Sequence, residues 1–240
     1  MKLDLLAIAA HPDDAELTCG GTLAKMVAAG HQAGILDLTR GEMGTRGTPE
    51  VRAREADCAA QALGLHHREN LGLPDSDVRP TRESKLKLAT RLRALRPRTV
   101  ILPYWEARHP DHYHASSLAY EACFLAGLKQ LPLEGEPFRP FKILYATMYA
   151  ETARPSLVVD ISQFFDQRMK AIRCYQSQFN RPAGAKKDGG LHIPLDELEA
   201  RVTHICRHYG MMIGVQYGEP FLVREILQVD DIVTMPVRSI

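Results

Sequence analysis

Two short segments of the sequence combine histidines with carboxylates at close spacing. The first is His-Pro-Asp-Asp at residues 11–14, and the second is His-Pro-Asp-His at residues 109–112. Imidazole nitrogens and carboxylate oxygens are ligands that suit zinc and similar divalent ions. A catalytic zinc ion keeps three protein ligands and leaves one position open for water. Together the two segments hold enough side chains for such a site.

The ligand set that we expect is His11, Asp14 and His112, drawn from both segments. A metal held in this way lowers the pKa of its bound water to about 7, so that hydroxide becomes available at neutral pH. Zinc is the expected ion, although ferrous iron uses the same ligands in the cell. The segments therefore predict metal-dependent hydrolysis.

The remaining side chains of the two segments fit the proton transfers of a hydrolysis. We expect Asp13 to act as general base, because it lies beside a ligand without being needed as one. His109 is expected to protonate the leaving group or to stabilise an oxyanion, with Asp111 orienting it. The structural alternative is a capped turn at residues 11–14, in which the aspartates accept helix amide hydrogens. Two such segments, each after an apolar run, favour the metal site.

The elements around the two segments predict how they come together. Residues 3–10 and 99–103 are apolar runs that indicate buried strands, and each run precedes one of the segments. Further strands are expected at 34–39, 69–73, 142–149, 156–159 and 221–229, and helices at 22–29, 50–63, 83–95, 116–128, 163–176 and 194–208. Alternating strands and helices predict an α/β, Rossmann-like fold with a mainly parallel sheet and helices on both faces. In such sheets ligands bind at the carboxyl ends of the strands.

Composition limits the class of protein. The chain has 240 residues and 45% hydrophobic content, with no linker or repeat, so residues 1–240 are expected to form a single domain. A net charge of +1 gives no reason to expect nucleic acid or a membrane surface as partner. Five scattered cysteines without a C-x-x-C pair argue against a disulfide framework or a cysteine zinc site. Without an apolar span or a cleavable leader, a cytoplasmic location is expected.

Several motifs together resemble one known family. The chain is similar to the zinc-dependent sugar N-deacetylases of the PIG-L or LmbE-like family over nearly its whole length. The resemblance is carried by AHPDDAE at 10–16, GG at 20–21, LTRGEMGTRG at 38–47, NLGLPD at 70–75, RHPDH at 108–112, YQSQF at 175–179 and GVQYGEPF at 214–221. It implies removal of acetate from an N-acetylglucosaminide. The most similar branch acts on N-acetylglucosaminyl-L-malate in bacillithiol biosynthesis.

The resemblance also implies roles for residues outside the metal site. It implies that Arg52 and Asp75 hold sugar hydroxyls, and that Arg108 meets a carboxylate of the aglycone. Arg46, in the glycine-rich loop, is either a substrate contact or a solvated charge. A homo-oligomer is expected as well. One departure is Ala107, where the mycothiol branch has a tyrosine that stabilises the oxyanion.

Other functions compete with this interpretation. The substrate could be another N-acetylglucosamine conjugate, either of the mycothiol type or a chitooligosaccharide. A nucleotide-binding Rossmann-like protein is disfavoured, because the first turn lacks the G-x-G-x-x-G spacing that lets a pyrophosphate approach the backbone. A protein that merely retains a metal would not need Asp13 and His109 beside the ligands.

Overall fold

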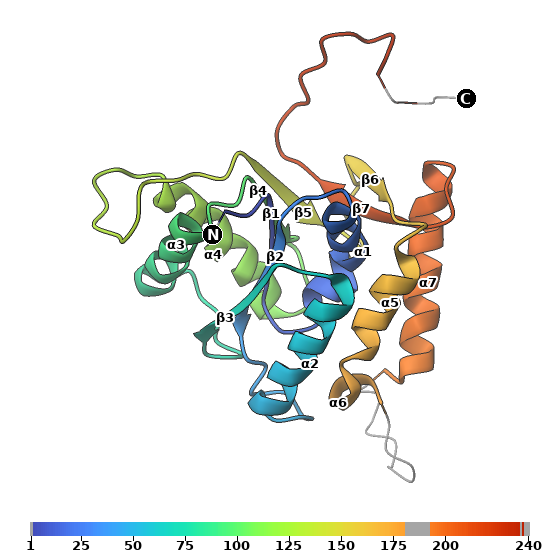
Figure 1. The fold of residues 1–240 in the computed structure, drawn as a ribbon, viewed down its shortest axis with the longest axis horizontal. Helices are drawn as coiled ribbons and strands as arrows, with labels where there is room; N and C mark the ends of the chain where they lie inside the picture. Colours follow the sequence, from blue (N-terminus) through green and yellow to red (C-terminus); the bar gives the residue numbers. More distant parts are fainter. Residues whose placement is uncertain (1, 181–192, 236, 238–240) are drawn as a thin grey trace.

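A seven-stranded sheet forms the centre of the molecule in the computed structural model, which describes residues 2–180, 193–235 and 237 (Figure 1). Its strands are β1 (Leu5–Ala9), β2 (Ala33–Thr39), β3 (His67–Leu73), β4 (Thr99–Pro103), β5 (Lys142–Ala146), β6 (Leu157–Asp160) and β7 (Gly218–Leu222). The order across the sheet is β3-β2-β1-β4-β5-β7-β6. The pairs from β3 to β5 are parallel, whereas β7 is antiparallel to both of its neighbours. The α/β class with a mainly parallel sheet is confirmed.

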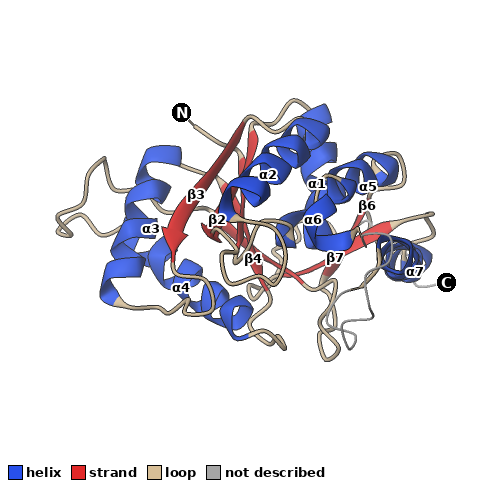
Figure 2. Cartoon of the chain, turned by 90° about the horizontal axis from the view of Figure 1, so that it is seen from below, coloured by secondary structure: helices blue, strands red, loops and turns tan. Residues whose placement is uncertain are grey.

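Helices cover both faces of the sheet. They are α1 (Asp14–Ala28), α2 (Pro49–Leu63), α3 (Arg82–Leu95), α4 (Pro110–Ala126), α5 (Phe165–Arg173), α6 (Gln176–Phe179) and α7 (Leu195–Met212). Figure 2 shows α3 and α4 on one side of the strands and α1, α2 and α5 on the other, with α7 beside β7. The sheet is therefore the middle of three layers.

The sequence of β1 explains why it lies at the centre. Leu6 and Ile8 belong to the core beneath α3 and α4, whereas Leu5 and Ala7 belong to the core beneath α1 and α2. All four are less than a tenth exposed. A strand that is buried on both faces needs apolar residues at every position, which is why this run is continuous rather than alternating.

The chain order places β1 and β4 side by side. After β1 the chain adds β2 and β3 on one side, and it then returns to pair β4 with the other side of β1. Ligand sites of open α/β sheets lie at such a reversal, outside the carboxyl ends of the two strands. His11 follows β1, and His109 precedes α4, the helix after β4. The two His/Asp segments therefore meet at this point.

Helix α1 is kinked at Cys19, whose backbone angles of φ −146° and ψ 16° are not helical. The break frees amides on its carboxyl-terminal side, and the Glu219 carboxylate accepts them from Gly21 and Thr22 at 2.8 and 2.7 Å. A Cβ atom on Gly21 would lie 3.0 Å from Glu219 Oε1, so glycine is needed for this close approach. The predicted helix at 22–29 began too late, because the glycine pair ends only the first part of the helix.

The other side of the kink is satisfied by Arg168, on α5. Its guanidinium donates to the carbonyls of Glu16 and Leu17 at 3.0 and 2.5 Å, and its Nε lies 3.3 Å from Glu219 Oε1. The two charged side chains therefore replace the backbone hydrogen bonds that the kink removes. Both are fully buried.

Some predicted boundaries differ from the observed ones. The last strand ends at Leu222 rather than continuing to 229, close to the point where its pairing with β6 ends at Leu157. The expected helix at 163–176 is divided into α5 and the short α6. Most of the loop expected at 180–190 lies outside the described residues.

The expectation against a disulfide is wrong for one pair. Cys58 on α2 is bonded to Cys174, which follows α5, across a sequence separation of 116 residues. Because α2 and α5 pack against each other, cysteines far apart in the sequence become neighbours. Cys19, Cys123 and Cys206 are free and buried.

No helix within the described ranges combines the length and the apolar character that crossing a membrane requires.

Candidate active site

Three side chains converge between the carboxyl ends of β1 and β4. Asp14 Oδ2 lies 3.3 Å from His11 Nδ1 and 3.3 Å from His112 Nε2. Each residue offers one donor atom, and these atoms lie within 4.8 Å of one another. Two imidazoles and one carboxylate suit zinc or ferrous iron, so the donor set fits a divalent metal ion.

Two further carboxylates face the other nitrogen of His11. Its Nε2 lies 3.1 Å from Asp75 Oδ1 and 3.1 Å from Asp111 Oδ2. Burial alone would lower the pKa of His11, but the hydrogen bonds and charges of Asp14 and Asp75 raise it to about 11. A metal-binding histidine usually donates its second ring N–H to a carboxylate, which fixes the ring. Asp75 and Asp111 are placed for that task.

Asp111 differs from the arrangement expected of it. Its carboxylate also accepts the amides of Ser76 at 2.8 Å and Val78 at 3.2 Å, so it holds His11 and the turn after β3. Its link to His109 runs through the backbone, since the Asp111 amide donates to His109 Nδ1 at 3.2 Å. The described contacts therefore include no hydrogen bond between the Asp111 carboxylate and His109, and the expected orientation of His109 by this carboxylate is not observed.

His109 occupies the N-cap of α4 and is exposed. Because Nδ1 accepts a hydrogen bond, the proton of the neutral ring belongs on Nε2. Burial and the charges of His11 and His112 lower the pKa of His109, which favours this neutral form. The neutral ring is thus suited to donate a hydrogen bond through Nε2.

Asp13 lies beside the candidate metal ligands. It belongs to neither of the two clusters that could hold a metal ion, which are His11, Asp14 and His112, and His11, His109 and Asp111. Its φ of 111° is in the left-handed region, which is uncommon for a residue other than glycine. It stands at the N-cap of α1 without a side-chain cap hydrogen bond, so the capped-turn alternative does not describe it. Burial raises the pKa of Asp13 to about 7, while the charge of Arg52 acts in the opposite direction. Such a carboxyl group is suited to general-base catalysis near neutral pH.

Arg52, on α2, is turned toward Asp13. Its Nη2 lies 3.3 Å from Asp13 Oδ2 and also donates to the carbonyl of Pro12. Gly41 packs directly on the guanidinium, since a Cβ atom there would lie 2.9 Å from Arg52 Cζ. Arg52 and Asp75, expected to hold sugar hydroxyls, are thus engaged with Asp13 and His11, although both still line a polar pocket of about 230 Å³.

The two remaining arginines, Arg46 and Arg108, are outside the described lining of the polar pocket. Arg46 is half-buried on the loop before α2, where its carbonyl accepts from Gln178 Nε2 at 2.8 Å and its Nη1 donates to the Asn180 carbonyl. Arg108 is exposed next to His109. The nearby carboxylate of Glu106 accepts from Thr152 Oγ1 at 2.8 Å, and the described contacts contain no pair between it and Arg108.

The sequence analysis missed a buried polar group behind the site. Glu16 is fully buried, and it accepts from Arg68 Nη1 at 2.5 Å and from the Tyr175 hydroxyl at 2.9 Å. Arg68 also pairs with Asp37 on β2 at 2.9 Å. The signal was present, because Glu16 ends the motif AHPDDAE and Tyr175 begins the motif YQSQF. These contacts tie the start of α1 to β2, β3 and the segment before α6.

The comparisons with known proteins agree with this geometry. A family model described as PIG-L, GlcNAc-PI de-N-acetylase, matches residues 6–123, a span that contains both His/Asp segments. Diacetylchitobiose deacetylase of Thermococcus kodakarensis is 31% identical over 228 residues, covering 90% of this chain and 80% of that protein. A probable N-acetyl-alpha-D-glucosaminyl L-malate deacetylase 2 of Bacillus cereus is 25% identical over 191 residues, covering 74% and 84%.

Among solved structures, the conserved protein TT1542 from Thermus thermophilus is similar in both sequence and fold. It is 47% identical, with a TM-score of 0.84, and the match covers 95% of this chain and 98% of that one. The similarity therefore extends over nearly the whole chain, beyond residues 6–123 that the family model matches.

Proposed function

The chain belongs to the PIG-L (LmbE-like) family of deacetylases, and from this premise we propose that it hydrolyses the acetamide of an N-acetylglucosaminide with a divalent metal ion. The convergence of His11, Asp14 and His112 beside the non-ligating Asp13 carries the proposal. A site that only stored a metal would have no use for a base of raised pKa next to it.

The side chains around the metal site divide the chemistry among them. His11, Asp14 and His112 would hold a zinc or ferrous ion, which would supply an acidified water and a polarised amide carbonyl. Asp13 takes the proton of that water, and Arg52 holds the Asp13 carboxylate in place. Asp13 passes this proton on to the departing amine, while neutral His109 donates a hydrogen bond to the developing oxyanion through Nε2. With Ala107 at the position of the mycothiol-branch tyrosine, His109 is the side chain left for this task.

The polar pocket is our proposed site for the sugar. Its lining includes Asp75, Ser76 and Gly44 as well as His109 and Arg52, so it offers hydrogen-bond donors and acceptors from several elements. Sugar hydroxyls are recognised by such convergent polar groups. In this arrangement Asp75 serves His11 and the sugar together.

Two aglycones remain in competition. Arg108 is exposed beside His109, and its guanidinium suits a carboxylate such as those of malate. The relative that covers 90% of this chain is a diacetylchitobiose deacetylase, which favours a second sugar instead. We propose N-acetylglucosaminyl-L-malate as the substrate, with diacetylchitobiose as the second candidate.

The test is acetate release from three compounds by protein of measured metal content. These are N-acetylglucosaminyl-L-malate, diacetylchitobiose and N-acetylglucosamine. We expect metal-dependent turnover that is restored by zinc or ferrous iron after chelation, with the largest kcat/KM on the malate conjugate. Metal-loaded protein without acetate release from any of the three would overturn the proposed function, and preference for chitobiose would overturn only the choice of aglycone.

A further inference from the structure

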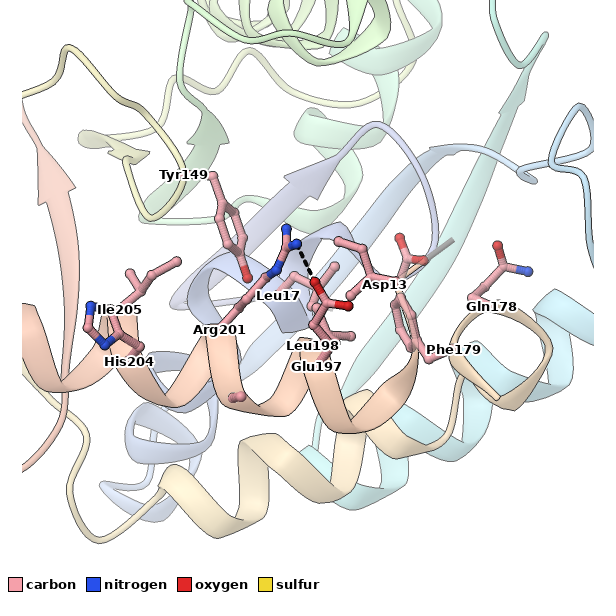
Figure 3. A pocket seen from close by; sticks show the side chains of 12 residues that line it. Asp13, Leu17, Tyr149, Gln178, Phe179, Glu197, Leu198, Arg201, His204 and Ile205 are labelled. Carbon is pink, nitrogen blue, oxygen red and sulfur yellow. Dashed lines mark hydrogen bonds and ion pairs between the residues drawn. The ribbon is translucent and has the colours of Figure 1, made fainter. Parts of the chain in front are cut away.

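A second cavity adjoins the candidate site at Asp13. It measures about 730 Å³ and lies among α1, α6 and α7 (Figure 3). Its described lining is mostly apolar and includes Leu17, Phe179, Ile193, Leu198 and Ile205. A volume of this size falls in the range of cavities that hold small ligands.

Asp13 connects this cavity to the reaction. It lines both the apolar cavity and the polar pocket, so the two cavities meet at the proposed general base. The carbonyl carbon of an amide substrate must lie within reach of Asp13. One substituent of the amide then extends into each cavity.

The chemistry of the linings decides which substituent takes which side. The amine side of the substrate carries a sugar, which suits the polar pocket around Asp75 and Arg52. The acyl side then faces Leu17 and Phe179, where hydrocarbon is stabilised by leaving water. An acetyl methyl group would fill only a small part of the cavity.

Two residues of the lining, Glu197 and Arg201, carry opposite charges that neutralise each other, so the cavity does not favour a charged ligand. Glu197 and Arg201, one turn apart on α7, form an ion pair with each other, drawn as a dashed line in Figure 3. Deeper along the same helix the lining continues through Leu198 and Ile205. The cavity thus offers a mostly apolar surface, and the charges of Glu197 and Arg201 at its edge are paired with each other.

We propose that this cavity binds the N-acyl chain of the substrate, and that the enzyme accepts linear acyl groups longer than acetyl. The inference rests on the proposed function and defines its substrate class further. In the reaction the bond between the acyl carbon and nitrogen breaks, water supplies hydroxyl to the acyl carbon and a proton to the amine, and a fatty acid is released with the free amino sugar.

The experiment measures kcat/KM for glucosamine carrying N-acetyl, N-butanoyl or N-hexanoyl groups, with the metal-loaded enzyme. Burial of each added methylene is expected to raise kcat/KM by up to about fourfold. Faster cleavage of the hexanoyl compound than of the acetyl compound supports the proposal. Acetate release without cleavage of the longer chains overturns it while leaving the proposed function intact, and release of no acid at all overturns the proposed function itself.

Two variants at one position test whether the acyl chain binds in the cavity. Ile205 is half-buried, so Ile205→Glu introduces a charge into the lining and Ile205→Trp reduces its volume. Both should lower kcat/KM on the hexanoyl compound by about tenfold, the worth of roughly two buried methylenes, and leave the acetyl compound within about twofold. The control is His208→Glu, exposed on the same helix and outside the cavity lining, which should leave both substrates unchanged. Equal losses on both substrates in the two Ile205 variants would overturn the assignment.

Discussion

Arg168 and Glu219 form an ion pair inside the kink of α1, with 3.3 Å between Nε and Oε1 and with both side chains fully buried. Each also satisfies backbone groups that the kink leaves open. Because the amino-terminal part of α1 begins with Asp14, this pair supports the helix that carries one carboxylate of the candidate metal site.

Removing one member of the pair should be costly, because it leaves an uncompensated buried charge. Arg168→Met is expected to lower the free energy of unfolding by about 3–5 kcal/mol. Arg173→Met is the control on the same helix, since its pair with Glu199 is half-exposed and worth at most about 1 kcal/mol. Urea unfolding of the two variants measures the difference. Similar losses in both would show that the buried pair does not support the kink.

Substitution of the proposed metal ligands should release the bound ion. Purified protein should carry about one divalent ion per chain, and His11→Ala or His112→Ala should release it, because each removes one of three donors. His114→Ala, on the same helix as His112 but outside both clusters, should retain the ion. Elemental analysis after gel filtration measures the content. Retention of the full ion content in the His11→Ala, His112→Ala double variant would refute the ligand set.

Asp13 is expected to matter for turnover but not for metal binding. Asp13→Asn should keep the ion while kcat falls by roughly 10²–10⁴-fold, the range for loss of a general base. Asp77→Asn, an exposed aspartate in the turn after β3, should leave kcat unchanged. Acetate release and metal content are measured on the same preparations. Wild-type turnover in Asp13→Asn would remove it from the mechanism, and loss of the ion would make it a ligand.

Arg108 should separate charged from uncharged substrates. Arg108→Ala is expected to weaken kcat/KM on N-acetylglucosaminyl-L-malate by roughly 1.5–3 kcal/mol, the usual worth of a hydrogen bond to a charged group. Uncharged N-acetylglucosamine should be hydrolysed at nearly the wild-type rate. Arg79→Ala, which removes another exposed arginine, is the control for a general charge effect. If both substrates suffer alike, the arginine holds its loop rather than the aglycone.

The disulfide should contribute to stability. Reduction of the Cys58–Cys174 bond, or Cys174→Ser, is expected to lower the free energy of unfolding by about 2–4 kcal/mol, because the cross-link restricts the unfolded chain. Denaturant unfolding with and without reductant measures this change. Cys58→Ser should show no further loss on adding reductant. An unchanged free energy of unfolding of the wild-type protein on adding reductant would contradict the presence of the disulfide.

The strands were predictable because most of them are buried on both faces. The apolar run at 99–103 coincides with β4, and the centre of β1 was recognised in the same way. The start of α1 was not predictable from local pattern, since the glycine pair at 20–21 reads as a break unless Glu219, almost 200 residues later, is known to accept its amides. Tertiary contacts of that kind leave no local signal.

The candidate site was also predictable only in part. The convergence of His11 and His112 follows from parallel strands whose carboxyl ends share one edge of the sheet. The carboxylates facing His11 Nε2 were assigned to other tasks, because Asp75 enters from the turn after β3 and spacing alone does not reveal where a loop side chain points. Oligomeric state and cellular location stay predictions.

The contact between His11 and Asp111 joins positions that are 100 residues apart. The side chains of the candidate metal site therefore cannot assemble until β2, β3 and the returning β4 have taken their places beside β1, and such long-range pairing is a slow part of folding. A nascent chain that ends before residue 112 holds His11 and Asp14 without their third partner. Metal binding during refolding should accordingly report the docking of β4 and α4, and the ion then stabilises only chains in which these two elements have docked.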